Sequence, residues 1–154
     1  MSEDVLSVIP ADPHWQPEPS AADRAVALVT ALTGGLAADS DVEIDVDWYD
    51  RPVVVDGAQN LERIGCPHCR GTIGLAWWAD LIEEHQDGFP TLTAVVPCCG
   101  ATTSLDGLDF DWPCGFARFE IAVWNPETAR LSDQELTAVA TALGHPVRQI
   151  RARV

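Results

Sequence analysis

The feature that most constrains the fold of this 154-residue chain is a pair of cysteine groups about thirty residues apart. The first group is Cys66-Pro67-His68-Cys69, and the second is the adjacent pair Cys98-Cys99. A Cys-x-x-Cys spacing allows two thiolates to bind one ion, and a tight turn that contains Pro67 and is followed by Gly71 leaves backbone N–H groups free to donate to the sulfurs. If both groups bind the same ion, the chain between them must fold back on itself.

We therefore predict a structural zinc ion in a zinc-ribbon-like arrangement, in which the second group directly follows a strand. The predicted ligands are Cys66, Cys69, Cys98 and Cys99. Neighbouring residues of a strand point to opposite faces, so Cys98 and Cys99 can reach one metal together only from an irregular turn. The fourth ligand is therefore open: Cys114 and then His85 are the alternatives to Cys98, and His68 is the least favoured because it lies inside the first turn.

Two other interpretations of the cysteines stay open, namely reduced thiols without a metal and a redox pair. Cys-Pro-His-Cys is also the active-site sequence of certain thioredoxin-like thiol oxidases, in which a helix N-terminus lowers the pKa of the first thiol. Here the sequence continues as Arg70-Gly71-Thr72-Ile73-Gly74, and its two glycines disfavour a helix. The redox interpretation is therefore weaker than the zinc interpretation.

The formal net charge of −15 disfavours nucleic acid as a ligand, because a phosphate backbone is bound by a basic surface. No apolar run approaches the roughly 20 residues of a membrane helix, and the acidic start, Met1-Ser2-Glu3-Asp4, differs from a basic secretory signal. We therefore expect a cytoplasmic protein with reduced thiols. The acidic excess lies mainly in residues 1–60 and fits either a solvated surface or a face that binds a basic partner protein.

The chain contains no lysine, since all nine of its basic residues are arginine. A phosphate-binding P-loop needs its lysine, as do pyridoxal-phosphate enzymes and Schiff-base aldolases, so these classes are excluded. A zinc ion held by four thiolates also has no open position for a reacting water. We therefore predict a non-catalytic adaptor or protein-interaction module. The alternatives are a metal- or thiol-dependent enzyme, with Asp80, Glu83, Glu84 or His85 as base, and a zinc or redox sensor.

Hydrophobic periodicity predicts an α+β fold with two β-α-β-like halves around one sheet. In the first half we expect a strand over residues 5–9, a helix capped by Ser20 that ends before Gly34, a strand over 42–48, and a hairpin partner over 53–55 after a turn at Asp50-Arg51-Pro52. In the second half we expect a strand over 119–124, a helix with a capping box from Ser132 to Glu135 that ends at Gly144, and a strand over 147–154.

We predict one domain over residues 1–154 and a zinc-ribbon-like insertion within it over residues 64–115. The insertion should contain a helix over residues 75–86 and a strand over residues 91–96. Arginine recurs along the last strand, at Arg148, Arg151 and Arg153, and acids alternate along residues 43–47. We expect these two strands side by side, either in one sheet or between the copies of a homodimer.

Several segments together resemble a family of small uncharacterised bacterial proteins, and the likeness covers nearly the whole chain. The segments are Cys66-Pro67-His68-Cys69, Trp77-Trp78, Gly88-Phe89, Val96-Pro97-Cys98-Cys99-Gly100-Ala101, Thr103-Ser104-Leu105 and Trp112-Pro113-Cys114-Gly115-Phe116-Ala117-Arg118-Phe119. Members of that family are often labelled sugar ABC transporter ATPases. The absence of lysine and of a G-x-x-x-x-G-K-[ST] loop is incompatible with that label here, so the resemblance implies a shape and no established function.

Overall fold

The computed structural model describes residues 3–55 and 61–153, and the chain in it is an α+β protein. One antiparallel sheet of four strands has the order β2-β8-β1-β9, formed by β1 (Asp4–Pro10), β2 (Glu43–Val55), β8 (Gly115–Trp124) and β9 (Val147–Arg153). Helix α1 (Pro19–Leu32) connects β1 to β2, and α3 (Asp133–Leu143) connects β8 to β9. The two predicted β-α-β halves are thus present and interlock, because β8 lies between the strands of the first half and β1 between those of the second.

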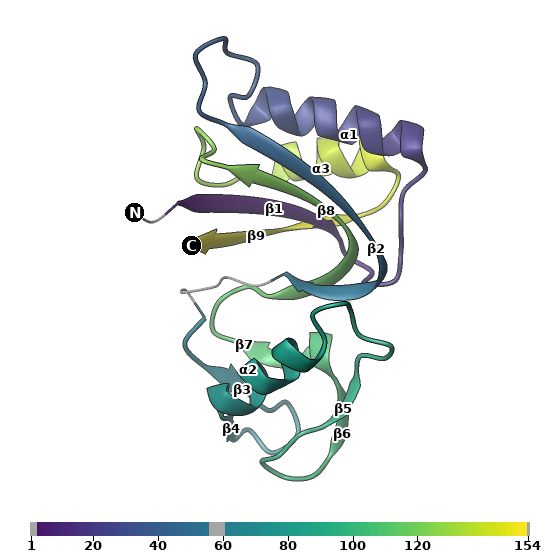
Figure 1. Cartoon of the computed structure of the whole chain (residues 1–154), viewed down its shortest axis with the longest axis vertical. Coiled ribbons are helices and arrows are strands. Elements are labelled where there is room, and N and C mark those ends of the chain that lie inside the picture. Colours follow the sequence, from purple (N-terminus) through teal and green to yellow (C-terminus); the bar gives the residue numbers. More distant parts are fainter. Residues whose placement is uncertain (1–2, 56–60, 154) are drawn as a thin grey trace.

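Helices α1 and α3 cover the same face of this sheet (Figure 1). Alternate residues of β1 and β8 point toward the helices, as the period of a strand requires. The main core lies between the two layers and includes Leu6, Val8, Ala25, Val29, Phe119, Ile121, Val123, Leu131, Val139 and Leu143. The sheet face opposite the helices is therefore the one left open for other contacts.

Helices α1 and α3 begin with different capping arrangements. Helix α1 begins at Pro19 after Glu18, so the expected cap at Ser20 is wrong by two residues, because proline is well suited to the first helical position. Helix α3 has the predicted capping box, in which the Ser132 hydroxyl accepts from the Glu135 N–H and the Glu135 carboxylate accepts from the Ser132 N–H. It ends as predicted at Gly144, which has a φ of 90°.

The predicted hairpin between residues 42–48 and 53–55 is wrong, because both segments belong to the single strand β2. Both of them pair with β8, and the register shifts at an irregularity between Trp48 and Val53. Strand β8 is long enough to offer pairing positions to both segments, so the turn-forming sequence Asp50-Arg51-Pro52 bends one strand instead of reversing it.

A smaller lobe is inserted between β2 and β8 and lies below the main sheet in Figure 1. Its elements are β3 (Ile64–Gly65), β4 (Thr72–Ile73), α2 (Leu75–Glu84), β5 (Thr93–Val95), β6 (Thr102–Ser104), a 3₁₀ turn (Leu105–Gly107) and β7 (Asp109–Phe110). They form one sheet in the order β4-β3-β7 and a second of β5 and β6. The lobe has its own core around Ile64, Trp78, Phe89 and Val96, which continues into Phe116 of β8.

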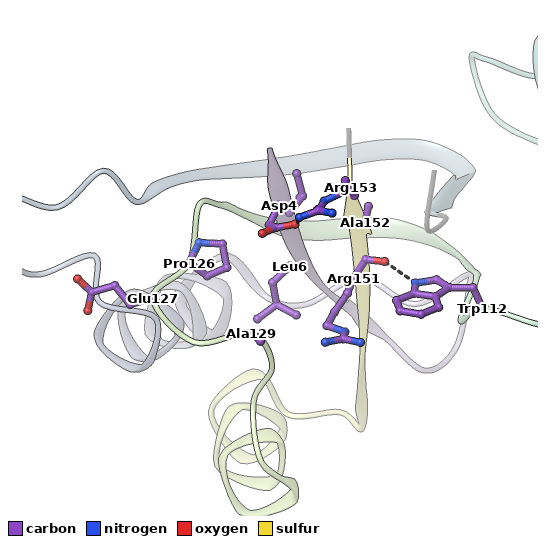
Figure 2. Close-up of a pocket in the computed structure, with 10 residues that line it drawn as sticks. Asp4, Leu6, Trp112, Pro126, Glu127, Ala129, Arg151, Ala152 and Arg153 are labelled. Atoms are coloured by element: carbon purple, nitrogen blue, oxygen red, sulfur yellow. Dashed lines mark hydrogen bonds and ion pairs between the residues drawn. The ribbon is translucent and has the colours of Figure 1, made fainter. Parts of the chain in front are cut away.

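Polar contacts hold the lobe against the edge strand β9. The indole Nε1 of Trp112 donates to the carbonyl of Arg151 at 2.6 Å (Figure 2), and Nη2 of Arg148 donates to the carbonyl of Cys114 at 3.0 Å. On the other side of the lobe, the N–H of Phe89 donates to the carbonyl of Pro52 in β2 at 2.8 Å. The lobe is therefore tied to both edge strands of the main sheet.

The expected pairing of the basic and acidic strands within one sheet is wrong. The acids of β2 and the arginines of β9 lie on opposite edges, because β8 and β1 separate the two strands. Within the described part of the chain, one ion pair forms, between Arg153 and Asp4 at 3.5 Å. The same part of the chain contains no helix with the length and apolar character needed to cross a membrane.

Candidate metal centre

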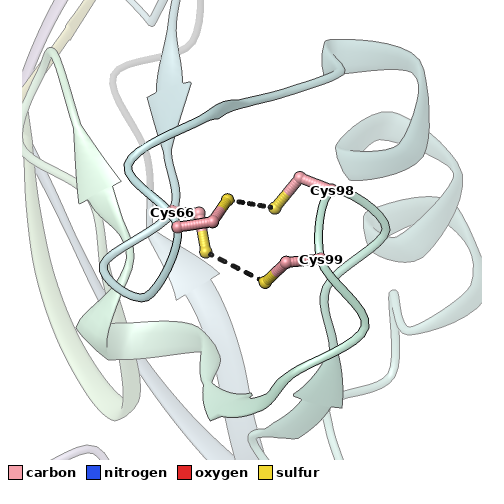
Figure 3. A group of neighbouring side chains, drawn as sticks. Cys66, Cys98 and Cys99 are labelled. Atoms are coloured by element: carbon pink, nitrogen blue, oxygen red, sulfur yellow. Dashed lines mark hydrogen bonds between the residues drawn. The ribbon is translucent and has the colours of Figure 1, made fainter.

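Two loops of the lobe bring four cysteine sulfurs into one group (Figure 3). Cys66 and Cys69 lie on the loop between β3 and β4, and Cys98 and Cys99 lie on the loop between β5 and β6. The Sγ atoms of Cys66 and Cys99 are 3.8 Å apart, and those of Cys69 and Cys98 are 3.5 Å apart. All four sulfurs lie within 4.8 Å of one another, so the group could hold a metal ion.

The first loop is a tight knuckle closed by its own backbone. The N–H of Cys66 donates to the carbonyl of Gly71 at 2.9 Å, and the N–H of Arg70 donates to the carbonyl of Cys66 at 3.0 Å. Arg70 has a φ of 64°, which reverses the chain direction within this short loop. The Gly71 N–H, which the sequence predicts to be free for a sulfur, donates to Sγ of Cys69 at 3.3 Å.

The second loop repeats this backbone closure with a different sequence. Here the N–H of Val96 donates to the carbonyl of Ala101 at 3.0 Å, and the N–H of Gly100 donates to the carbonyl of Val96 at 2.9 Å. Gly100 has a φ of 73°, close to that of Arg70 in the first knuckle. The matching bonds align Val96-Pro97-Cys98-Cys99-Gly100-Ala101 with Cys66-Pro67-His68-Cys69-Arg70-Gly71.

This alignment explains how adjacent cysteines reach the same centre. Cys99 corresponds to Cys69, whereas Cys98 occupies the position of His68 and Val96 the position of Cys66. The loop around Cys98 is a turn, where neighbouring side chains need not alternate between two faces as they do in a strand. The irregular turn that the sequence analysis required is therefore present.

Backbone N–H groups and the crowding of sulfurs set the pKa values of these thiols in opposite directions. The N–H groups of Cys69 and His68 lower the pKa of Cys66 to about 6, against the effect of burial. For Cys98, desolvation and the neighbouring sulfurs raise the pKa to about 12. For Cys99, the Ala101 N–H lowers the pKa, but partial desolvation of the sulfur and hydrogen bonds with the Cys66 and Cys69 sulfurs together raise it. A bound cation would favour the ionised form of the thiols that surround it.

The two alternative ligands lie elsewhere in the lobe. Cys114 is buried in the lobe core and is outside the four-sulfur group. The His85 ring stacks on Phe89 with centroids 4.6 Å apart, and its Nδ1 lies 2.8 Å from the carbonyl of Leu81. The sulfurs of Cys98 and Cys99 already complete a group of four with those of Cys66 and Cys69. A four-ligand site therefore does not require Cys114 or His85.

The spacing of the sulfurs fits a tetrahedral ion of the size of zinc. A Zn–S distance of about 2.3 Å places the sulfurs of a regular tetrahedron about 3.8 Å apart, and two of the sulfur pairs here are separated by 3.8 and 3.5 Å. Neither a family model, nor a curated protein, nor a solved structure matches this chain. The chemistry of the centre is therefore argued from its own residues.

A second group of polar residues lies on the open face of the main sheet. The Ser7 hydroxyl donates to Oε2 of Glu120 at 2.6 Å, and the Tyr49 hydroxyl also bonds to the Glu120 carboxylate. Asp47 lies directly opposite Glu120 in the register of β2 and β8, with Asp45 two residues before it on the same face. Burial first, and then the charges of Asp47 and Asp45, raise the pKa of Glu120.

These polar residues line a shallow groove of about 250 Å³ on the open sheet face. Apolar side chains of Val5, Ala122 and Trp124 line the same groove. Sequence analysis found the acids of β2 but missed Glu120, because an isolated acid in an apolar strand carries no signal that it will face the acids of another strand. Only the register of β2 against β8 brings these carboxylates together.

Proposed function

We propose that this protein is a non-catalytic zinc-binding adaptor. In this proposal, Cys66, Cys69, Cys98 and Cys99 bind zinc as a closed tetrathiolate centre that stabilises the lobe. The open sheet face, with its acidic groove, binds a basic segment of a partner protein. The four-sulfur group is the observation that carries the proposal, because its sulfurs lie within 4.8 Å of one another and two of their separations, 3.8 and 3.5 Å, are close to those expected around a tetrahedral zinc ion.

Small lobes of this kind gain much of their stability from a metal. The strands of the lobe are only two or three residues long, and such short hairpins are marginal on their own. Binding of zinc to four thiolates would cross-link two loops that are about thirty residues apart in sequence. Four sulfur ligands also leave no coordination position for a water or substrate, which argues against a hydrolytic enzyme.

The charges of the open sheet face support the proposal of a basic partner. Like charges directly opposite one another on neighbouring strands repel, as those of Asp47 and Glu120 do. A lysine or arginine placed between them would reduce that repulsion and the cost of burying Glu120. The apolar side chains beside these acids, including Trp124, would bury the aliphatic part of such a residue.

Two measurements test the proposal. Elemental analysis of the purified, reduced chain should give one zinc per chain, and thiol titration should show four thiols that become reactive only after chelation.

A labelled octa-arginine peptide should bind the zinc-loaded protein, and D45N/D47N should weaken that binding more than D39N/D41N, which removes the same charge from the exposed loop before β2. Equal effects of the two variants would show that net charge alone attracts the peptide and would overturn the assignment of the groove.

A zinc or redox sensor is the second candidate, and the exposure of the centre favours it. Of the four cysteines in the centre, Cys69, Cys98 and Cys99 are exposed, and Cys66 is buried. An exposed thiolate site can be oxidised by hydrogen peroxide, which would join two of the thiolates in a disulfide, take up two protons from solvent to form two waters, and release the zinc ion. Micromolar peroxide that releases zinc within minutes would favour the sensor, whereas retention of zinc under those conditions would favour the adaptor.

A further inference from the structure

A cavity of about 380 Å³ lies where the lobe meets the edge of the main sheet, beside the start of β1 and the end of β9 (Figure 2). On one side it is lined by Leu6, Pro126 and Ala129, which are apolar. On the other side it is lined by Arg151 and the indole of Trp112. Its volume lies at the lower end of the range for small-molecule sites, about 300–1,000 Å³.

Arg151 is the cation of this cavity that has no acidic partner. Among the residues that the structure describes, the ion pair on this side joins Arg153 to Asp4, and Arg151 forms none. Glu127 also lines the cavity, but its side chain extends away from Arg151 in Figure 2. The guanidinium of Arg151 instead lies over the Trp112 ring, with its Cζ 5.2 Å from the ring centroid.

Hydrogen bonds hold the walls of the cavity in place. The N–H of Asn125 donates to the carbonyl of Asp4 at 2.9 Å, which fixes the start of the loop that carries Pro126 and Ala129. At the end of that loop, the side-chain amide of Gln149 bonds to both the N–H and the carbonyl of Leu131, each at 2.8 Å. Trp112 is fixed by its bond to the carbonyl of Arg151. A ligand would therefore enter a largely preformed site.

We propose that this cavity binds a small organic carboxylate with an apolar body. The planar guanidinium of Arg151, which lies over the Trp112 indole, presents a two-pronged donor that matches a carboxylate. Leu6, Pro126 and Ala129 would contact the apolar part of the ligand. This site is separate from the four-sulfur centre and from the acidic groove, so it does not depend on the function proposed above.

Indole N–H resonances of the purified, ¹⁵N-labelled full chain provide the test, with benzoate as the probe. The Trp112 resonance, assigned by its loss in W112F, should shift saturably with millimolar benzoate. R151Q should weaken binding at least about tenfold, the order expected for loss of a charged hydrogen bond. The matched variant R130Q removes the same charge from an exposed position on the nearby loop and should bind benzoate like the natural sequence.

Because R151Q could also disturb Trp112, A129F gives a second test. It places a phenyl ring in the cavity from an exposed position and leaves Arg151 in place, so it should abolish the benzoate shift without changing the fold. Acetate, which lacks the apolar body, should bind more weakly than benzoate. The proposal is overturned if benzoate gives no saturable shift, if R130Q and R151Q weaken binding equally, or if inorganic phosphate binds as well as benzoate.

Discussion

Val96 occupies, in the second knuckle of the lobe, the backbone position that Cys66 occupies in the first. Both N–H groups donate to the carbonyl five residues later, at 3.0 and 2.9 Å, and both carbonyls accept from the N–H four residues later. Both side chains are fully buried. The centre therefore uses the first and fourth positions of one knuckle and the third and fourth positions of the other.

This equivalence predicts that a cysteine at position 96 can replace Cys98. C98S should lose most of its zinc affinity, since one of the four thiolates is removed. The double variant V96C/C98S should recover tight binding, because its second knuckle then has the same Cys-x-x-Cys pattern as the first. Competition with a zinc-binding dye measures both affinities. If V96C/C98S binds zinc no better than C98S, the two knuckles do not present equivalent ligand positions to the metal.

Removal of the metal should unfold the lobe and leave the main sheet folded. The cores of the two parts are largely separate, with Leu6, Val29 and Phe119 in one and Ile64 and Val96 in the other. After chelation, backbone amides of residues 64–110 should exchange with deuterium within minutes, while those in the centres of β1 and β8 should stay protected. C114S, which leaves all four sulfurs of the centre in place, is the control. Simultaneous loss of protection in both parts would instead mean that the metal stabilises one cooperative unit.

Tyr49 should ionise at unusually high pH. Burial raises its pKa to about 12, with further contributions from the charges of Glu120 and Asp47 and from its bond to Glu120. Tyr49 is the one tyrosine of the chain, so absorbance at 295 nm after a rapid pH jump follows this group alone. Because the pKa is raised on folding, its contribution to stability is complete below about pH 10 and is lost as the pH rises toward 12. E120Q should lower the midpoint, and a midpoint near 10 in the natural sequence would contradict the burial of Tyr49.

Glu120 should make the fold less stable as the pH rises from mildly acidic values. Its pKa is raised on folding, so between the unfolded and folded pKa values the folded state binds a proton that the unfolded state does not. Stability therefore falls with rising pH across that window. Urea unfolding of the natural sequence and of E120Q at several pH values should give a difference in free energy of unfolding that changes with this sign. E43Q, at an exposed position of β2, should show a smaller change, and a difference that is independent of pH would exclude the raised pKa.

Local patterns were enough to predict much of the secondary structure. The helix from Asp133 to Leu143 has the predicted capping box and glycine end, because those signals act within a few residues. The alternation around Phe119 and Ile121 likewise marked β8, although that strand begins earlier than predicted, at Gly115. Local signals failed at Asp50-Arg51-Pro52, where pairing with the long partner strand β8 prevailed over a sequence that favours a turn.

The sequence by itself determined the α+β class and the two β-α-β halves, and it predicted the group of four cysteines while leaving Cys114 and His85 as alternatives to Cys98, because each of these depends on residue type and on spacing along the chain. The tertiary structure alone decided which strands are neighbours. It separated the arginines of β9 from the acids of β2, placed Glu120 opposite Asp47, and brought Trp112 against Arg151. These relationships depend on strand order, register and the docking of the lobe, which arise from packing between segments far apart in sequence and leave no periodic signal within any one of them.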